Sequence, residues 1–241
     1  MARHRVYLDH GPDLQPGPLV VTGEEAQHAV RVKRVATGDS VVVLDGRGHI
    51  GQAVVQGADK ADRGNWRLLL NVNDVSPAAA PSPRIEVFTA VPKGSRLSDL
   101  IDGLSQVGAA SWAPLWTARG EVRPREGKME RLDRTTAEAA KQCGRAWRLE
   151  IGEGCTVAQA AAGPSQVVIA DASGAPYQGT GAATVRLLIG PEGGWTVDEM
   201  GAARAAGARV ATFGPHVMRI ETAAIVATAM ILGAETGPKG A

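Results

Sequence analysis

Hydrophobic and polar positions divide the chain into two parts with different periodicity. In the first part, DSVVVLDGRGHIGQAVVQGA predicts two strands around a DGRG turn, and NWRLLLNVNDV predicts another strand. A helix is expected in TGEEAQHAVRVKRV, ending near Gly38, because Thr22 and Glu25 have the spacing of a capping box. Short strands with one helix predict a small β-barrel domain over residues 1–75.

The pattern changes after residues 76–83, SPAAAPSP, which contain three prolines and no charge and indicate a semi-rigid linker. From residue 84 onward, apolar strands alternate with helices of amphipathic or apolar character. Strands are expected in RIEVFTAV, near WAPLWTA, and in SQVVIADAS, TVRLLIG and ARVATFG. Helices are expected in RLSDLIDGLSQVG, MERLDRTTAEAAKQCGRAW, TVDEMGAARAAG and IETAAIVATAMILGAE. This alternation predicts an α/β domain over residues 84–241, with a mostly parallel sheet covered on both faces.

Composition is that of an ordinary globular protein, with 44% hydrophobic and 21% charged residues. No apolar run has the length needed to cross a bilayer, and the N-terminal MARHRVYLDHG lacks the apolar core of a signal peptide. Two cysteines, Cys143 and Cys155, do not make a disulfide framework. A cytoplasmic location is therefore expected, with no membrane partner.

The net charge of +1 conceals an uneven distribution. Residues 84–150 carry 12 basic and 9 acidic side chains, whereas residues 151–241 carry 5 and 7. A basic region beside a slightly acidic one suits a protein that holds a polyanion in one place and performs chemistry in another. On charge alone, a solvated helix face explains the same pattern, and both interpretations stay open.

Two glycine corners are the chain's most distinctive feature. LLIGPEGGWTVDEM predicts a strand, a corner from Gly190 to Gly194, and a helix capped by Thr196 and ended by Gly207. TFGPHVMRIETA predicts a second strand-to-helix corner at Gly214. Because ligands of open parallel sheets sit outside the carboxyl ends of strands, two successive corners suit two walls of one pocket. Tight turns without a ligand are the alternative.

The corners do not match the known phosphate-binding loops. The first lacks the Gly-Lys-Ser/Thr of a phosphate loop and the G-x-G-x-x-G of a dinucleotide-binding loop, and Glu192 would repel a pyrophosphate. A carboxylate there favours a cationic or hydrogen-bond-donating ligand. Arg219, placed between two apolar residues, is either functional or paired with Glu221 or Glu192. The five histidines are scattered, so no metal site is expected.

LLIGPEGG and FGPHVMRIETAA together resemble the C-terminal signature of the uracil-N3 ribosomal RNA methyltransferases, which belong to the SPOUT superfamily. The resemblance extends over nearly the whole chain. HAVRVKRVATGDSVVVLDGRG is similar to the PUA-like barrel region of the family, and VPKG and AAKQCGR are similar to its internal motifs. GPEGG with R-x-E-T-A at this spacing is a specific combination, although each piece alone is weak.

This resemblance implies a PUA-like RNA-binding β-barrel followed by a SPOUT-type α/β domain whose last segment forms a trefoil knot. It also implies a homodimer that binds S-adenosylmethionine inside the knot and methylates N3 of one uridine in small-subunit (16S) ribosomal RNA. The residues support such a cofactor, since S-adenosylmethionine carries no phosphate and methyl transfer needs no metal. Alignment of the methyl group with N3 would be the main catalytic contribution.

The residues implied by the resemblance fall into three groups. The cofactor-binding residues are Leu188, Gly190, Glu192, Gly193, Gly194, Phe213, Gly214, Val217, Met218 and Thr222. The RNA-binding residues are Arg31, Arg34, Lys93, Arg119 and Arg145. Arg219 and Glu221 are the catalytic residues, with Arg219 stabilising a developing uracil anion by charge-assisted hydrogen bonding. The group that accepts the N3 proton stays open between Glu221, Glu192 and water.

The chain departs from the family pattern at one position with chemical consequence. Thr117, Ala118 and Arg119 stand where members often carry Ser-Glu-Arg, so a carboxylate is missing at Ala118. A methyltransferase of the same fold acting on another RNA, and a non-catalytic RNA-binding module, remain alternatives. A dehydrogenase-like nucleotide binder would require the absent G-x-G-x-x-G.

Overall fold

The computed structural model describes residues 4–8, 13–60, 65–123 and 126–237. The chain divides into two compact units. The first comprises residues 1–80 with residues 137–148, and the second comprises residues 81–136 with residues 149–241. Each unit has its own hydrophobic core.

The first unit is a five-stranded sheet with one covering helix. Its elements are β1 (His4–Tyr7), β2 (Gly17–Thr22), α1 (Gly23–Arg31), β3 (Ser40–Leu44), β4 (His49–Lys60) and β5 (Trp66–Pro77). The strand order is β1-β3-β4-β5-β2, in which β1 pairs with β3 in parallel and the other pairs are antiparallel. Alternate residues of β4 and β5 face a core of small aliphatic side chains, which the buried Ala26 and Ala29 of α1 join.

The two strands predicted around the DGRG turn are confirmed as β3 and β4. The capping box predicted at the start of α1 is wrong, because Thr22 is the N-cap residue but its side chain makes no capping hydrogen bond. Glu25 has other partners: its carboxylate accepts a hydrogen bond from the Tyr7 backbone N–H and pairs with Lys141. Tertiary contacts therefore outcompete the local cap. The helix also ends at Arg31, earlier than expected.

Residues 137–148 belong to the first unit, which the linear pattern does not indicate. They attach through backbone and indole hydrogen bonds. The Gly48 N–H donates to the carbonyl of Ala146 at 2.9 Å, and Trp147 Nε1 donates to the carbonyl of Ala78 at 3.3 Å. β5 also runs on to Pro77, into the segment expected to be a linker.

The second unit is a parallel α/β sheet, as the sequence predicts. Its elements are β6 (Arg84–Thr89), α2 (Arg96–Val107), β7 (Ser111–Trp116), α3 (Glu126–Cys143), β8 (Glu150–Ile151), β9 (Cys155–Thr156), α4 (Val157–Ala161), β10 (Gln166–Pro176), β11 (Thr184–Ile189), α5 (Val197–Ala205), β12 (Arg209–Thr212) and α6 (Ile220–Thr236). The last residues of α3 contribute to the first unit. The strand order is β12-β10-β11-β6-β7-β8, with β9 pairing to β7, and every pair is parallel.

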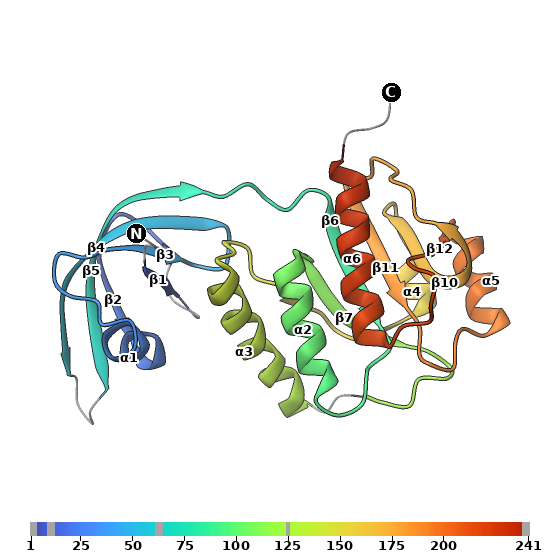
Figure 1. Ribbon diagram of the computed structural model, residues 1–241, viewed down its shortest axis with the longest axis horizontal. Coiled ribbons are helices and arrows are strands. Elements are labelled where there is room, and N and C mark those ends of the chain that lie inside the picture. The colour runs from blue at the N-terminus through green and yellow to red at the C-terminus, as the bar shows by residue number, and fades with distance from the viewer. Residues whose placement is uncertain (1–3, 9–12, 61–64, 124–125, 238–241) are drawn as a thin grey trace. The chain divides into compact units, whose positions relative to one another are not determined.

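Both faces of this sheet are buried, which confirms the predicted layering. On one face, Val168 and Leu187 pack in the core that contains α2 and α6, which lie side by side (Figure 1). On the other face, their sequence neighbours Ile169 and Leu188 pack in the core under α4 and α5. The alternation of side chains along each strand therefore supplies both layers.

Candidate active site

The first glycine corner connects β11 to α5 and is built as the sequence predicts. Thr196 Oγ1 accepts a hydrogen bond from the Glu199 backbone N–H at 3.2 Å, and Glu199 Oε2 accepts one from the Thr196 backbone N–H at 2.9 Å. Both halves of the capping box are present, so the start of α5 is fixed. The Trp195 indole N–H donates to the carbonyl of Ala170 at 3.2 Å, which ties the corner to β10.

Two positions in this corner favour glycine for different structural reasons. A Cβ at Gly190 would lie 2.8 Å from the Trp195 ring, so the indole excludes any side chain there. Gly194 has φ +71°, which a residue with a side chain adopts at a cost, and no atom lies within 4 Å of the position its Cβ would take. The corner is thus closely packed beneath Trp195 and open at Gly194.

The second glycine corner connects β12 to α6. Phe213 is buried and stacks on Tyr177, with ring centroids 5.6 Å apart and an interplanar angle of 23°. Gly214 has φ +155°, and Val217 beyond it is 93% exposed. Since β11 and β12 flank β10 in parallel, both corners follow strand ends at the same edge of the sheet. The structure therefore places the two predicted loops together.

Arg96, which sequence reasoning missed, connects both corners. Its Nη1 lies 3.8 Å from Oε1 of Glu192 in the first corner and 3.9 Å from Oε1 of Glu221 at the start of α6. Its Nε donates to the carbonyl of Lys93 at 3.3 Å. Arg96 is the first residue of α2, which follows β6. A basic residue just beyond the carboxyl end of a central strand is a signal in the sequence that could have identified it.

Arg119, predicted to contact RNA, is directed at the first corner. Its Nη1 donates to the carbonyl of Gly193 at 2.6 Å and lies 3.5 Å from the carbonyl of Trp195. The preceding Ala118 backbone N–H donates to Glu199 Oε1 at 2.8 Å. Burial opposes ionisation of Glu199, but the hydrogen bonds from Thr196 and Ala118 lower its pKa below the ordinary range. The loop after β7 therefore braces the corner.

The predicted catalytic residues differ in their surroundings. Arg219 is exposed, and its side chain forms no ion pair or hydrogen bond with the part of the chain that the structure describes. The ion pairs with Glu192 and Glu221 considered for it are made by Arg96 instead. The side chain of Glu221 is 14% exposed, and its Oε2 is buried with no hydrogen-bond partner among the described residues.

The predicted cofactor-binding residues fall into three environments. Leu188 and Phe213 are buried, so their side chains serve the core. The partly buried positions are Gly190, Gly194 and Met218. The exposed positions are Glu192, Gly193, Gly214, Val217 and Thr222. The corners thus offer mainly backbone groups and one carboxylate to a ligand.

The predicted RNA-binding residues divide between the two units. Lys93, in the second unit, is exposed and pairs with Glu121. Arg31 and Arg34 are exposed in the first unit. Arg145, also in the first unit, is partly buried, and burial lowers the pKa of its guanidinium.

Arg34 has an unusual backbone conformation. Its φ is +53°, the one positive φ of a residue other than glycine among the described positions. It lies three residues after the end of α1, in a turn where the Val35 N–H donates to the carbonyl of Ala29 at 3.2 Å and the Lys33 N–H donates to that of His28 at 3.1 Å. Glycine is the usual residue at such a helix end, so the arginine is kept there at a conformational cost.

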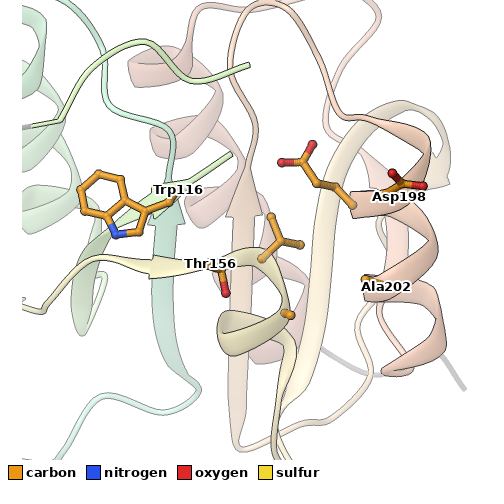
Figure 2. Close-up of a pocket in the computed structure, with 7 residues that line it drawn as sticks. Trp116, Thr156, Asp198 and Ala202 are labelled. Carbon is orange, nitrogen blue, oxygen red and sulfur yellow. The ribbon is translucent and has the colours of Figure 1, made fainter. Parts of the chain in front are cut away.

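A separate depression lies between the ends of β7, α4 and α5 (Figure 2). It is lined by Trp116, Thr156, Val157, Ala158, Asp198, Glu199 and Ala202. None of these is a predicted cofactor-binding residue. The site is therefore defined by the chemistry of the two corners and not by this hollow.

The described residues contain no group of three or more His, Cys, Asp and Glu side chains that could hold a metal ion. Among their helices, none combines the length and the apolar character required to span a bilayer.

Residues 80–232 match the RNA methyltransferase domain family, and residues 21–61 match the RNA methyltransferase PUA domain family. The ribosomal RNA small subunit methyltransferase E of Synechocystis sp. is 31% identical over 88% of this chain and 72% of its own. The ribosomal RNA small subunit methyltransferase E of Mycobacterium bovis is 31% identical over 92% of this chain and 88% of its own. A protein from Legionella pneumophila, solved with bound cofactor SAM, has a TM-score of 0.79 and 25% identity over 97% of this chain and 98% of its own.

The fold and the two matched regions define an RNA methyltransferase with a PUA domain and a parallel α/β domain. The identity to relatives over most of the chain makes the assignment more specific. The chain belongs to the ribosomal RNA small subunit methyltransferase E family.

Proposed function

We propose that this protein transfers the methyl group of S-adenosylmethionine to N3 of a uridine in small-subunit (16S) ribosomal RNA. The observation that carries the proposal is the pair of side chains found at the edge of the parallel sheet where both glycine corners lie. There, an exposed Arg219 with no ion-pair partner in the described chain follows the second corner, and Glu221 has a buried oxygen without a partner. A cation and a proton acceptor are the groups that deprotonation of a uracil requires.

The residues of the corners fit this cofactor. No atom lies within 4 Å of the positions that a Cβ would take at Gly194, and at Gly214 only the Met218 methyl is that close, at 3.9 Å. Backbone N–H and C=O groups can therefore approach an adenine edge. The corners carry no lysine, as expected for a ligand without phosphate, and Glu192 supplies a negative charge for a sulfonium or an amino group.

The reaction is a displacement in which atoms and electrons balance. When bound, the cofactor supplies an electrophilic methyl group. The N3–C bond forms as the S–C bond breaks, the electron pair of that bond stays on sulfur, and the N3 proton leaves to a base. Arg219 stabilises the negative charge that develops on the uracil, and Glu221 Oε2 is the proton acceptor. Because N3 lies on the pairing edge, the target base must be unpaired or flipped out.

The proposed RNA contacts involve both units. Arg31, the last residue of α1, and Arg34, three residues further on, are both exposed and would neutralise backbone phosphates. Lys93 lies in the loop just before α2, three residues from Arg96, so it would contact RNA near the target base. Arg119 braces the first corner, so we assign it structural support instead of an RNA contact. The partly buried Arg145 is kept as a proposed RNA contact.

The remaining expectations of the family are part of the proposal. A homodimer, a cytoplasmic location and a trefoil knot at the C-terminus are included. Support for the knot comes from the connection between β10 and β11, which hydrogen-bonds to Glu235 in the last turn of α6. A knotted C-terminus requires an earlier segment to pass around the last helix, and these bonds hold such a segment against it.

The test is methyl transfer from S-adenosylmethionine to naked small-subunit RNA and to the assembled subunit, followed by nucleoside mass spectrometry. We expect 3-methyluridine. Another methylated nucleoside, or methylation of transfer RNA alone, would replace the proposed substrate. Calorimetric titration with S-adenosylmethionine, with NADH as control, separates an enzyme from a binding module, because a module would bind RNA but not the cofactor.

A further inference from the structure

Arg96 occupies a position that the catalytic scheme does not yet use. Its guanidinium contacts a carboxylate from each glycine corner, Glu192 and Glu221, through the same Nη1 atom. Its own place is fixed by the hydrogen bond from Nε to the carbonyl of Lys93 and by its location at the first residue of α2. The start of α2 therefore supplies the shared counter-ion of the two corners.

The charges around this guanidinium explain why it matters. Glu192 and Glu221 are both acidic and both lie within 4.0 Å of one nitrogen, so they would repel each other without it. Lys93 is engaged with Glu121, and the side chain of Arg219 has no contact with either carboxylate within the described residues. Arg96 is therefore the cation that holds the two acidic side chains together.

Glu221 presents its two oxygens to different surroundings. Oε1 is directed at Arg96, at 3.9 Å, whereas Oε2 is buried and has no hydrogen-bond partner in the described residues. A buried carboxylate oxygen without a partner costs about 1–3 kcal/mol, so its retention calls for a function. Engagement of Oε1 leaves Oε2 as the carboxylate oxygen whose lone pairs are unoccupied.

We propose that Arg96 is a positioning residue for methyl transfer, which orients Glu221 so that Oε2 accepts the N3 proton of the target uridine. This inference rests on the function proposed above. Arg96 touches neither the methyl group nor N3 and acts through Glu221.

The test compares Arg96→Gln, Arg96→Lys and the control Arg204→Gln, which removes an exposed arginine from α5 of the same unit. Arg96→Gln should lower kcat by about 10- to 100-fold while the Kd for S-adenosylmethionine and the KM for RNA change by less than about twofold. Arg96→Lys should recover part of kcat, because it restores the charge without the fork of donors. Arg204→Gln should match the wild type.

A double-mutant cycle with Glu221→Gln decides whether Arg96 acts through Glu221. The double variant should be no slower than Glu221→Gln alone, since Arg96 has no carboxylate at position 221 to orient once Glu221 is replaced. Additive losses in kcat, an unchanged kcat in Arg96→Gln, or a loss of cofactor affinity that accounts for the lower rate would each overturn the inference.

The four proteins of this cycle are the wild type, Arg96→Gln, Glu221→Gln and the double variant. They also distinguish a failure of this inference from a failure of the proposed function. If the wild type binds S-adenosylmethionine but transfers no methyl group to RNA, the proposed function fails. In that case the free energy of unfolding of the same four proteins is measured by urea denaturation. Coupling between Arg96 and Glu221 would support the orienting contact, and its absence would overturn it.

Discussion

The Tyr177 hydroxyl donates a hydrogen bond of 2.6 Å to Glu235 Oε1 and so links the end of β10 to the last turn of α6. The same carboxylate accepts bonds from the backbone N–H groups of Thr180, at 2.8 Å, and Gly181, at 2.6 Å, and from the Thr180 hydroxyl at 3.0 Å. A carboxylate is unfavourable near the C-terminus of a helix. These four donors compensate for that cost and close the connection over α6.

Glu235→Gln should destabilise the protein by roughly 1–2 kcal/mol at neutral pH, because charge-assisted hydrogen bonds are replaced by weaker ones on a partly exposed group. Burial opposes ionisation, but the bonds from Tyr177, Thr180 and Gly181 lower the pKa of Glu235 below its ordinary value near 4.5. A group with a lowered pKa contributes stability that is complete above its unfolded-state pKa and is lost as the pH falls.

The difference in unfolding free energy between wild type and Glu235→Gln should therefore shrink as the pH falls below about 4.5. Burial raises the pKa of Tyr177 above its ordinary value of 10, and Glu235 raises it further. The stability that the Tyr177 hydroxyl contributes is therefore complete below pH 10 and lost at higher pH. Urea denaturation across the acid range is the measurement. A difference that stays constant with pH would contradict the assigned contact.

Arg34→Gly should stabilise the folded protein by about 1 kcal/mol while weakening RNA binding. Glycine adopts the φ of +53° without the steric cost of a side chain. Loss of one phosphate contact should reduce the slope of log K against log salt by roughly one. Arg31→Ala is the matched control, because it removes a neighbouring charge without relieving backbone strain. An unchanged salt slope in both variants would mean that neither side chain faces RNA.

Gly193→Val should block binding of S-adenosylmethionine. A Cβ at Gly193 would lie in ordinary contact with the Arg119 side chain, at 3.4 Å, and the two methyl groups of valine would extend beyond it into the space proposed for the ligand. Gly201→Ala is the control, because this glycine of α5 has no atom within 4 Å of the Cβ position and alanine should stabilise the helix. Calorimetry decides the result, and normal cofactor affinity in Gly193→Val would remove the first corner from the pocket.

Arg219→Ala should reduce turnover by about 10²–10³-fold while cofactor affinity is kept, because its charge is needed when the uracil becomes anionic. Its exposed side chain has no partner in the described part of the chain, so the unfolding free energy should change by less than about 0.5 kcal/mol. Single-turnover methyl transfer and calorimetry measure the two effects. Turnover at the wild-type rate would refute the catalytic role.

The local part of the structure follows from the sequence. The alternating strands and helices predict the parallel sheet, and the Thr196 and Glu199 spacing predicts a capping box that forms in full. Such features depend on residues a few positions apart, which meet whatever the rest of the chain does. The same spacing at Thr22 and Glu25 fails because Glu25 meets Tyr7 and Lys141, which are distant in sequence.

The tertiary structure alone decided which side chains share the site. Sequence resemblance pointed to Arg219 and Glu221, but the partner of Glu221 is Arg96, 125 positions earlier along the chain. The use of Arg119 as a brace for Gly193 was equally hidden. Both contacts arise because parallel pairing gathers the carboxyl ends of β6, β7 and β11 at one edge, and strand order is set by long-range packing that no short window of sequence contains.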